Sequence, residues 1–143
     1  MHAQQISIFL ENKAGRLAEV TGILAAAGVN IRALALADTS DFGVLRLIVD
    51  DNQKAENALK QGGLTVSKTD VVAVAVDDRP GGLHHILELL QNAGINVEYM
   101  YAFVQHSGAN AVMIFRFDQP DDALKVLTAD GLKVIEGRRL YTM

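Results

Sequence analysis

The 143-residue chain has no cysteine, no tryptophan and only two prolines. Without cysteine there can be no disulfide, no thiolate nucleophile and no cysteine-ligated zinc or iron–sulfur site. No apolar run approaches the roughly 18–20 residues needed to span a membrane. The N-terminus, MHAQQISIFLENK, lacks the basic start, long apolar stretch and small-residue cleavage site of a signal peptide. We therefore expect a cytoplasmic protein with no membrane partner.

Dense clusters of lysine and arginine are also missing, and the formal net charge is −4. Nucleic acid is therefore not an expected partner, because binding a phosphate backbone usually needs a basic face. His84 and His85 are adjacent in an expected helix, so they point about 100° apart and do not suggest a shared metal. No Ser-His-Asp arrangement or nucleophile turn is recognisable. We expect no catalysis, no cofactor and no metal, although a small enzyme on a common fold stays an open alternative.

What the sequence does contain is a duplication. Shifted by 66 positions, residues 6–31 align without a gap over residues 72–97. The identical pairs are Gly15/Gly81, Leu17/Leu83, Leu24/Leu90, Ala27/Ala93, Gly28/Gly94 and Asn30/Asn96. Further along, residues 56–66 correspond to residues 121–134 after small insertions. The chain therefore consists of two related units.

Each unit has the pattern strand, helix, strand, strand, helix, strand. In the first, the pattern predicts a strand over 4–10, a helix over 14–27, extended segments on either side of a turn at 38–43, a helix over 51–61 and a closing strand at 64–69. This order predicts an α+β protein with two tandem ferredoxin-like βαββαβ units, at 1–70 and 71–143. Each has an antiparallel sheet with its helices on one face.

Two segments outside this pattern have competing interpretations. Asp38–Asp41 is a polar hairpin tip, which is either an ordinary turn or a lid over a ligand. The C-terminal residues 137–143 align with a strand that follows the first unit. We expect them to form an extra strand that pairs with an exposed strand edge.

The duplicated loop, ENKAGRL in the first unit and DDRPGGL in the second, carries the functional question. It matches neither the G-x-G-x-x-G nucleotide fingerprint nor the P-loop, and an acidic residue begins each copy. A purely structural interpretation stays open, in which Asn12 and Asp78 start the helices and the glycines permit close packing. Alternatively, helix N-terminal N–H groups bind a carboxylate.

Asn30 and Asn96 favour the second alternative. Each follows a helix-ending glycine and begins a strand, with an amide that can donate and accept hydrogen bonds. Within one unit, the loop and this asparagine lie at opposite ends of a helix, so they can meet only when a neighbouring unit packs alongside. An interface pocket of this kind would suit the carboxylate and ammonium groups of an amino acid.

These motifs resemble the ACT domain, a small-molecule regulatory module of amino-acid metabolism. The resemblance rests on ENKAGRL…AAGVNI and DDRPGGL…NAGINV and covers essentially the whole chain as a tandem pair. It implies amino-acid binding at interfaces between units. The implied ligand-binding residues are Asn12, Ala14, Gly15, Arg16, Leu17, Asn30, Ile31, Asp78, Pro80, Gly81, Gly82, Leu83, Asn96 and Val97.

Two positions depart from the family pattern. Ala14 stands where proline is favoured, and Asp78 stands where asparagine is frequent. Asp78 would repel a carboxylate but attract an ammonium group, so the two pockets could differ. We expect a non-catalytic, homodimeric protein that senses a free amino acid and modulates a metabolic enzyme. The alternative is a ligand-independent regulatory subunit or scaffold for such an enzyme.

Overall fold

The computed structural model describes residues 2–38, 41–103 and 110–142, so the tip of the expected hairpin at Thr39 and Ser40 lies outside it. The chain forms two compact units. The first comprises Gln4–Thr69, and the second comprises Asp70–Tyr141 together with His2 and Ala3. None of the helices in the described ranges has the length and apolar character needed to span a bilayer.

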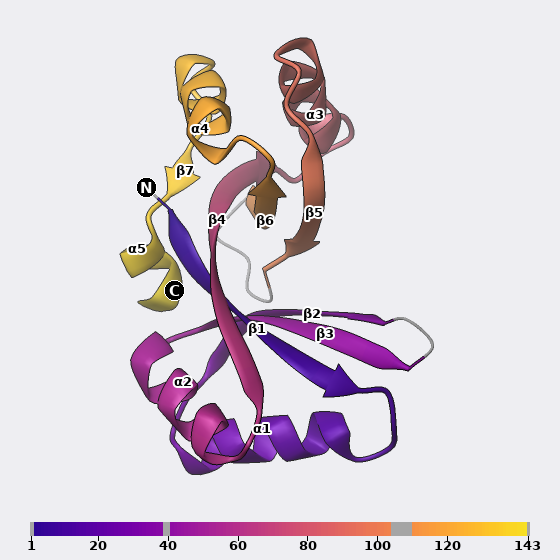
Figure 1. The fold of residues 1–143 in the computed structure, drawn as a ribbon. Helices are drawn as coiled ribbons and strands as arrows, with labels where there is room; N and C mark the ends of the chain where they lie inside the picture. The colour runs from indigo at the N-terminus through magenta and orange to yellow at the C-terminus, as the bar shows by residue number, and fades with distance from the viewer. Residues whose placement is uncertain (1, 39–40, 104–109, 143) are drawn as a thin grey trace. The chain divides into compact units, whose positions relative to one another are not determined.

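The first unit is a four-stranded sheet with two helices. Its strand order is β2-β3-β1-β4, and β3 pairs antiparallel with both β1 and β2 (Figure 1). Its elements are β1 (Ala3–Glu11), α1 (Arg16–Ala26), β2 (Ile31–Asp38), β3 (Phe42–Val49), α2 (Asn52–Gln61) and the first part of β4 (Thr65–Asp77).

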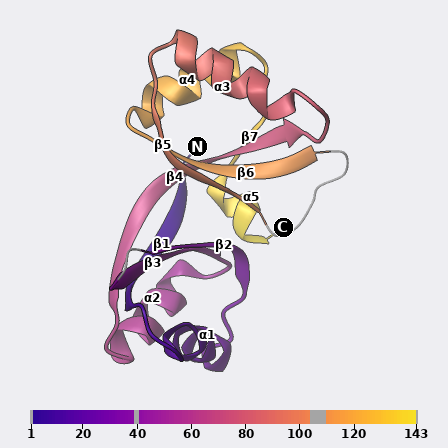
Figure 2. The ribbon, with the colours of Figure 1, turned by 90° about the vertical axis from the view of Figure 1, so that its right-hand side faces the viewer.

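The core of the first unit lies between the sheet and its helices. Ile8 lies opposite Leu45 across the β1–β3 pair, and both side chains are fully buried. Strand side chains alternate between faces, so this register places one apolar row against the helices. On the helix side, Val20 and Leu24 of α1 and Leu59 of α2 complete the cluster. Both helices cover the same face of the sheet (Figures 1 and 2).

The second unit repeats this arrangement. The strands have the order β5-β6-β4, with β7 also pairing β4, and all of these pairs are antiparallel. Its further elements are α3 (Gly82–Asn92), β5 (Val97–Ala102), β6 (Asn110–Phe117), α4 (Pro120–Ala129), β7 (Val134–Ile135) and α5 (Gly137–Thr142).

Aromatic stacking reinforces the second core, where the rings of Phe115 and Phe117 lie 5.3 Å apart and nearly parallel. Ile86 and Leu90 of α3 and Leu127 of α4 belong to the same buried cluster. Both halves therefore bury the faces that the periodicity predicts. The expected fold class, two tandem βαββαβ units of the α+β class, is confirmed.

The prediction of a C-terminal strand was wrong, because residues 137–142 form the short helix α5. The backbone N–H groups of Arg139 and Leu140 both donate to the carbonyl of Glu136, which closes a helical turn. A strand would place residues 138 and 140 on one face, yet Arg138 is 90% exposed in its side chain and Leu140 is fully buried. Helical spacing instead buries Gly137 and Leu140 together.

Candidate functional site

The two copies of the duplicated loop have the same backbone conformation. Gly15 immediately precedes α1 with φ 89°, and Gly81 precedes α3 with φ 87°. This left-handed conformation costs a residue with a side chain about 1–2 kcal/mol, so the backbone itself requires glycine at both positions. The repeated glycine is therefore explained by chain geometry before any ligand is considered.

Hydrogen bonds within the loops also correspond. The backbone N–H of Lys13 donates to the carbonyl of Glu11 at 3.0 Å, and that of Arg16 donates to the carbonyl of Lys13 at 3.3 Å. In the second loop, the backbone N–H of Arg79 donates to the carbonyl of Asp77 at 2.9 Å, and that of Gly82 donates to the carbonyl of Arg79 at 3.1 Å. The two loops thus share one framework.

In the structural alternative, Asn12 and Asp78 start the helices, and on this point that alternative was wrong. The N-cap residues are Gly15 and Gly81, and neither helix has a side-chain cap hydrogen bond. The reason is spacing, because a cap side chain accepts from an N–H group two or three residues later, and that group must lie in the first helical turn. Three residues after Asn12 and Asp78 come only Gly15 and Gly81, which precede the helices, so neither side chain is placed to cap the first turn.

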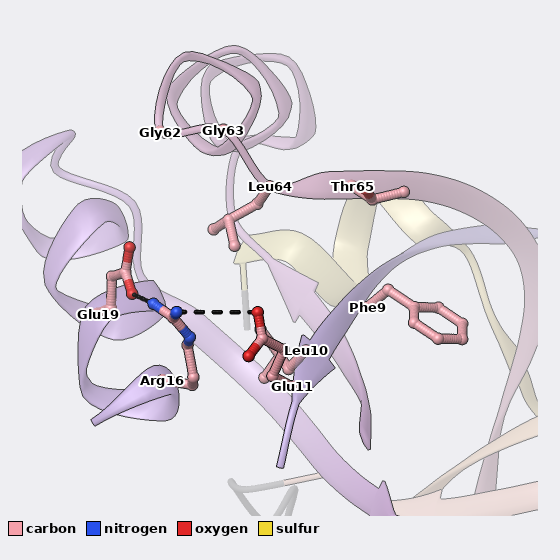
Figure 3. A pocket seen from close by; sticks show the side chains of 9 residues that line it. All are labelled: Phe9, Leu10, Glu11, Arg16, Glu19, Gly62, Gly63, Leu64 and Thr65. Carbon is pink, nitrogen blue, oxygen red and sulfur yellow. Dashed lines mark hydrogen bonds and ion pairs between the residues drawn. The ribbon is translucent and has the colours of Figure 1, made fainter. Parts of the chain in front are cut away.

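A cavity of about 230 Å³ lies behind the first loop, within the first unit (Figure 3). One side consists of the end of β1 and the first turn of α1, with the charged residues Glu11, Arg16 and Glu19. The other side is the turn from α2 into β4, residues 62–65. The cavity therefore combines two carboxylates and a guanidinium in a space of small-molecule size.

Arg16 connects the two carboxylates of this cavity. Its Nη1 lies 2.7 Å from Oε2 of Glu19, and its Nη2 lies 3.9 Å from Oε1 of Glu11. The arginine side chain is 35% exposed, so its guanidinium is held by protein groups yet stays accessible from solvent. Lys13 also approaches Glu11, with 3.4 Å between Nζ and Oε2.

A smaller cavity of about 80 Å³ lies on the other side of the same loop. Three predicted site residues, Asn12, Arg16 and Leu17, line it together with Leu36 of β2 and Gly43 of β3. Ala14 and Gly15 line neither cavity, although both are exposed at the loop surface. Arg16 is thus the predicted site residue that borders both spaces.

The predicted residues of the second loop are arranged differently. Asp78, Pro80 and Gly81 are exposed, Leu83 is half-buried and Gly82 is buried. A Cβ atom at Gly82 would overlap the carbonyl oxygen of Asp77 and lie 3.2 Å from its carbonyl carbon. The position that carries Arg16 in the first unit therefore has no space for a side chain in the second.

The repeated asparagines hold the far end of each sheet through their backbones. Asn30 N–H donates to the Asp50 carboxylate at 2.9 Å, and Asp50 N–H donates to the Asn30 carbonyl at 3.1 Å. Asn96 and Asp118 form the same pair, at 3.0 and 3.2 Å. The aspartates were not recognised from the sequence, although both follow the third strand of their unit.

Ile31 and Val97, the other strand-start positions in the predicted site, are half-buried. They and the asparagines lie at the opposite end of α1 or α3 from the loop. An 11-residue helix is about 16 Å long at 1.5 Å per residue, so the two groups do not meet within a unit. The loop residues and the strand-start residues therefore form separate parts of the predicted site.

The larger cavity adds residues that the sequence interpretation missed, namely Glu19 of α1 and the turn at 62–65. In the sequence, the one signal for Glu19 is a difference between the repeats: the first unit has a carboxylate at a position where the second unit has His85. Across the described part of the chain, no group of three or more metal-ligating side chains is placed to hold a metal ion.

Comparison with known proteins decides the family. The profile of the ACT domain pair matches residues 1–143, the whole chain. The chain belongs to the ACT domain pair family. Domains of this family are regulatory modules, and the resemblance seen in the two loop motifs is thereby confirmed.

Two solved structures are similar to this chain over nearly the whole length. A protein from Bacteroides thetaiotaomicron is 40% identical with a TM-score of 0.94, and the match covers 100% of this chain and 98% of that one. The ligand-free regulatory subunit of aspartate kinase from Thermus thermophilus is 20% identical with a TM-score of 0.63, covering 90% and 91%. The second likeness concerns the fold alone. A search of curated protein sequences found no match.

Proposed function

We propose that this ACT domain pair binds a free amino acid and, through that binding, modulates an enzyme of amino-acid metabolism. The observation that carries the proposal is the cavity beside the first loop, where Arg16 lies between Glu11 and Glu19. A free amino acid has a carboxylate and an ammonium group two bonds apart, so it needs both charges within a few ångströms. The cavity supplies both.

The size of the cavity agrees with such a ligand. Pockets for drug-sized molecules measure roughly 300–1,000 Å³, whereas this one measures about 230 Å³. A dinucleotide would exceed that space, but a single amino acid would not. The regulatory part of the proposal is supported by the family and by the likeness to the regulatory subunit of aspartate kinase from Thermus thermophilus.

A thermal-shift screen with each of the twenty amino acids at millimolar concentration tests the proposal. A ligand that binds the folded state raises the free energy of unfolding by about 2.7 kcal/mol when its concentration is a hundred times its Kd, and the melting temperature rises as a result. We expect one amino acid, or a chemically related few, to raise the melting temperature. If none does, the protein is not an amino-acid sensor.

A ligand-independent scaffold is the second candidate, and exposed apolar side chains favour it. Leu34 and Leu36 of the outer strand β2 are 44% and 52% exposed, and the exposed rings of Phe9 and Phe42 lie 6.1 Å apart. Large apolar side chains exposed on a sheet are typical of protein contacts, including those of the homodimer that we expect. Co-purification of an enzyme, combined with a silent amino-acid screen, would favour the scaffold.

A further inference from the structure

The two units share their loop framework but differ in the space behind it. The turns after α2 and α4 correspond through their hydrogen bonds, since Leu64 N–H donates to Leu59 and Leu132 N–H donates to Leu127. This correspondence places Gly62 of the first unit at the position of Asp130 in the second. The cavity beside Gly62 therefore has an identifiable counterpart beside Asp130.

In the second unit, this counterpart is bridged by two side chains. Nε2 of His85 lies 2.8 Å from Oδ2 of Asp130, which joins α3 to the turn after α4. His85 occupies the position of Glu19, and Asp130 that of Gly62. In the first unit, Glu19 and Gly62 line an open cavity, whereas in the second unit the side chains at these positions, His85 and Asp130, are in direct contact.

The second unit also lacks the cation. Gly82 stands at the position of Arg16, and a side chain there would collide with the Asp77 carbonyl. That collision involves a backbone atom, so a rotamer change cannot relieve it. The second unit thus lacks the guanidinium, and the contact between His85 and Asp130 spans the position that is open in the first unit.

We propose that each chain binds one amino acid, in the first unit only, with the ligand carboxylate on Arg16 and the ligand ammonium on Glu11 and Glu19. This inference rests on the proposed amino-acid binding and assigns it to one place. The guanidinium can accept a carboxylate in a bidentate contact, which is its preferred geometry. Binding exchanges the 2.7 Å contact between Arg16 and Glu19 for two new ones, since the freed Glu19 then receives the ammonium group.

The lining also restricts the ligand side chain. Leu64 offers limited apolar surface, whereas the two carboxylates, the guanidinium and Thr65 are polar, and the ring of Phe9 points away from the charged residues (Figure 3). With about 230 Å³ for the whole ligand, the cavity favours an amino acid whose side chain is short or polar. Large aromatic amino acids are expected to bind weakly or not at all.

Isothermal titration calorimetry of the full chain, with the amino acid that most stabilises the wild type, tests this assignment. We expect one ligand per chain. Arg16→Gln should weaken binding roughly ten- to a hundredfold, as the loss of a hydrogen bond to a charged group does. Lys125→Gln is the matched control, because it removes an exposed cation of α4 and should leave the affinity unchanged.

A second variant copies the closure found in the other unit. Glu19→His combined with Gly62→Asp should bridge the first cavity and reduce binding at least tenfold. The new Cβ at position 62 lies 2.7 Å from Cδ1 of Ile23, the movable end of a flexible side chain, so we expect the variant to fold. A cooperative melting curve verifies folding before titration.

The outcomes separate the two proposals. Two ligands per chain, or unchanged affinity in Arg16→Gln, would overturn the single-site assignment while leaving amino-acid binding intact. Absence of binding by the wild type to any of the twenty amino acids would overturn both. Reduced affinity in Arg16→Gln and in the bridged variant, with one ligand per wild-type chain, establishes the site.

Discussion

Replacing Gly82 with alanine should destabilise the protein, whereas the same change at Gly22 should stabilise it. Gly82 is the buried first residue of α3, and an added Cβ would overlap the Asp77 carbonyl oxygen. That oxygen already accepts the Arg79 N–H at 2.9 Å, so moving it would also strain the loop. Gly22 lies inside α1, and no atom lies within 4 Å of its added Cβ.

The expected magnitudes have opposite signs. Forcing an extra carbon into a packed site typically costs about 1–3 kcal/mol, and a clash with backbone places Gly82→Ala at the upper end of that range. Alanine in place of glycine inside a helix gains about 0.5–1 kcal/mol, mostly because the unfolded chain loses less entropy on folding. The two variants therefore form an internal comparison of one chemical change in two environments.

Urea denaturation followed by circular dichroism measures both variants. With a slope of roughly 2 kcal/mol per molar urea, a loss of about 3 kcal/mol for Gly82→Ala lowers the midpoint by about 1.5 M. Gly22→Ala should raise the midpoint slightly. If Gly82→Ala matched the wild type, the close approach of the second loop would be refuted, together with our reason why that loop cannot carry a counterpart of Arg16.

Two further predictions concern stability. Lys60 and Lys68 hydrogen-bond the Glu56 carboxylate and lower its pKa below the usual 4.5, so this stabilisation is present above the unfolded-state pKa and is lost as pH falls through the folded-state pKa. The difference in unfolding free energy between wild type and Glu56→Gln should accordingly shrink in acid titrations monitored by urea melts, and a pH-independent difference would contradict this. Leu140→Ala removes a fully buried side chain of α5 and should cost about 2–5 kcal/mol in urea denaturation. Arg138→Ala should stay within about 0.5 kcal/mol, and equal effects of the two substitutions would contradict the helical assignment of the C-terminus.

Much of the fold was predictable because the chain repeats its periodicity. Alternating apolar residues in 4–10 and helical spacing in 14–27 fix which faces must be buried, and the structure buries those faces in β1 and α1. The C-terminal segment failed because six residues are too few for periodicity to distinguish a strand from a helix. Its conformation is set by hydrogen bonds to Glu136 and by the burial of Leu140.

The candidate site was predictable only in part. The loop motif directed attention to Arg16, which borders both cavities of the first unit. The motif did not indicate Glu19 or the turn at Gly62, because these residues are distant from the loop in the chain and approach it only when α1 and α2 pack on the sheet.

The sequence by itself determined the duplication, the α+β class and the glycines that open α1 and α3, because periodicity and left-handed backbone geometry are local properties. Tertiary structure decided how the two copies of the loop differ. Whether a cavity stays open depends on pairs that are distant in sequence, such as His85 with Asp130, and on the Asp77 carbonyl that excludes a side chain at Gly82. Two related motifs therefore have unequal surroundings, since each lies against a turn whose residues differ between the two units.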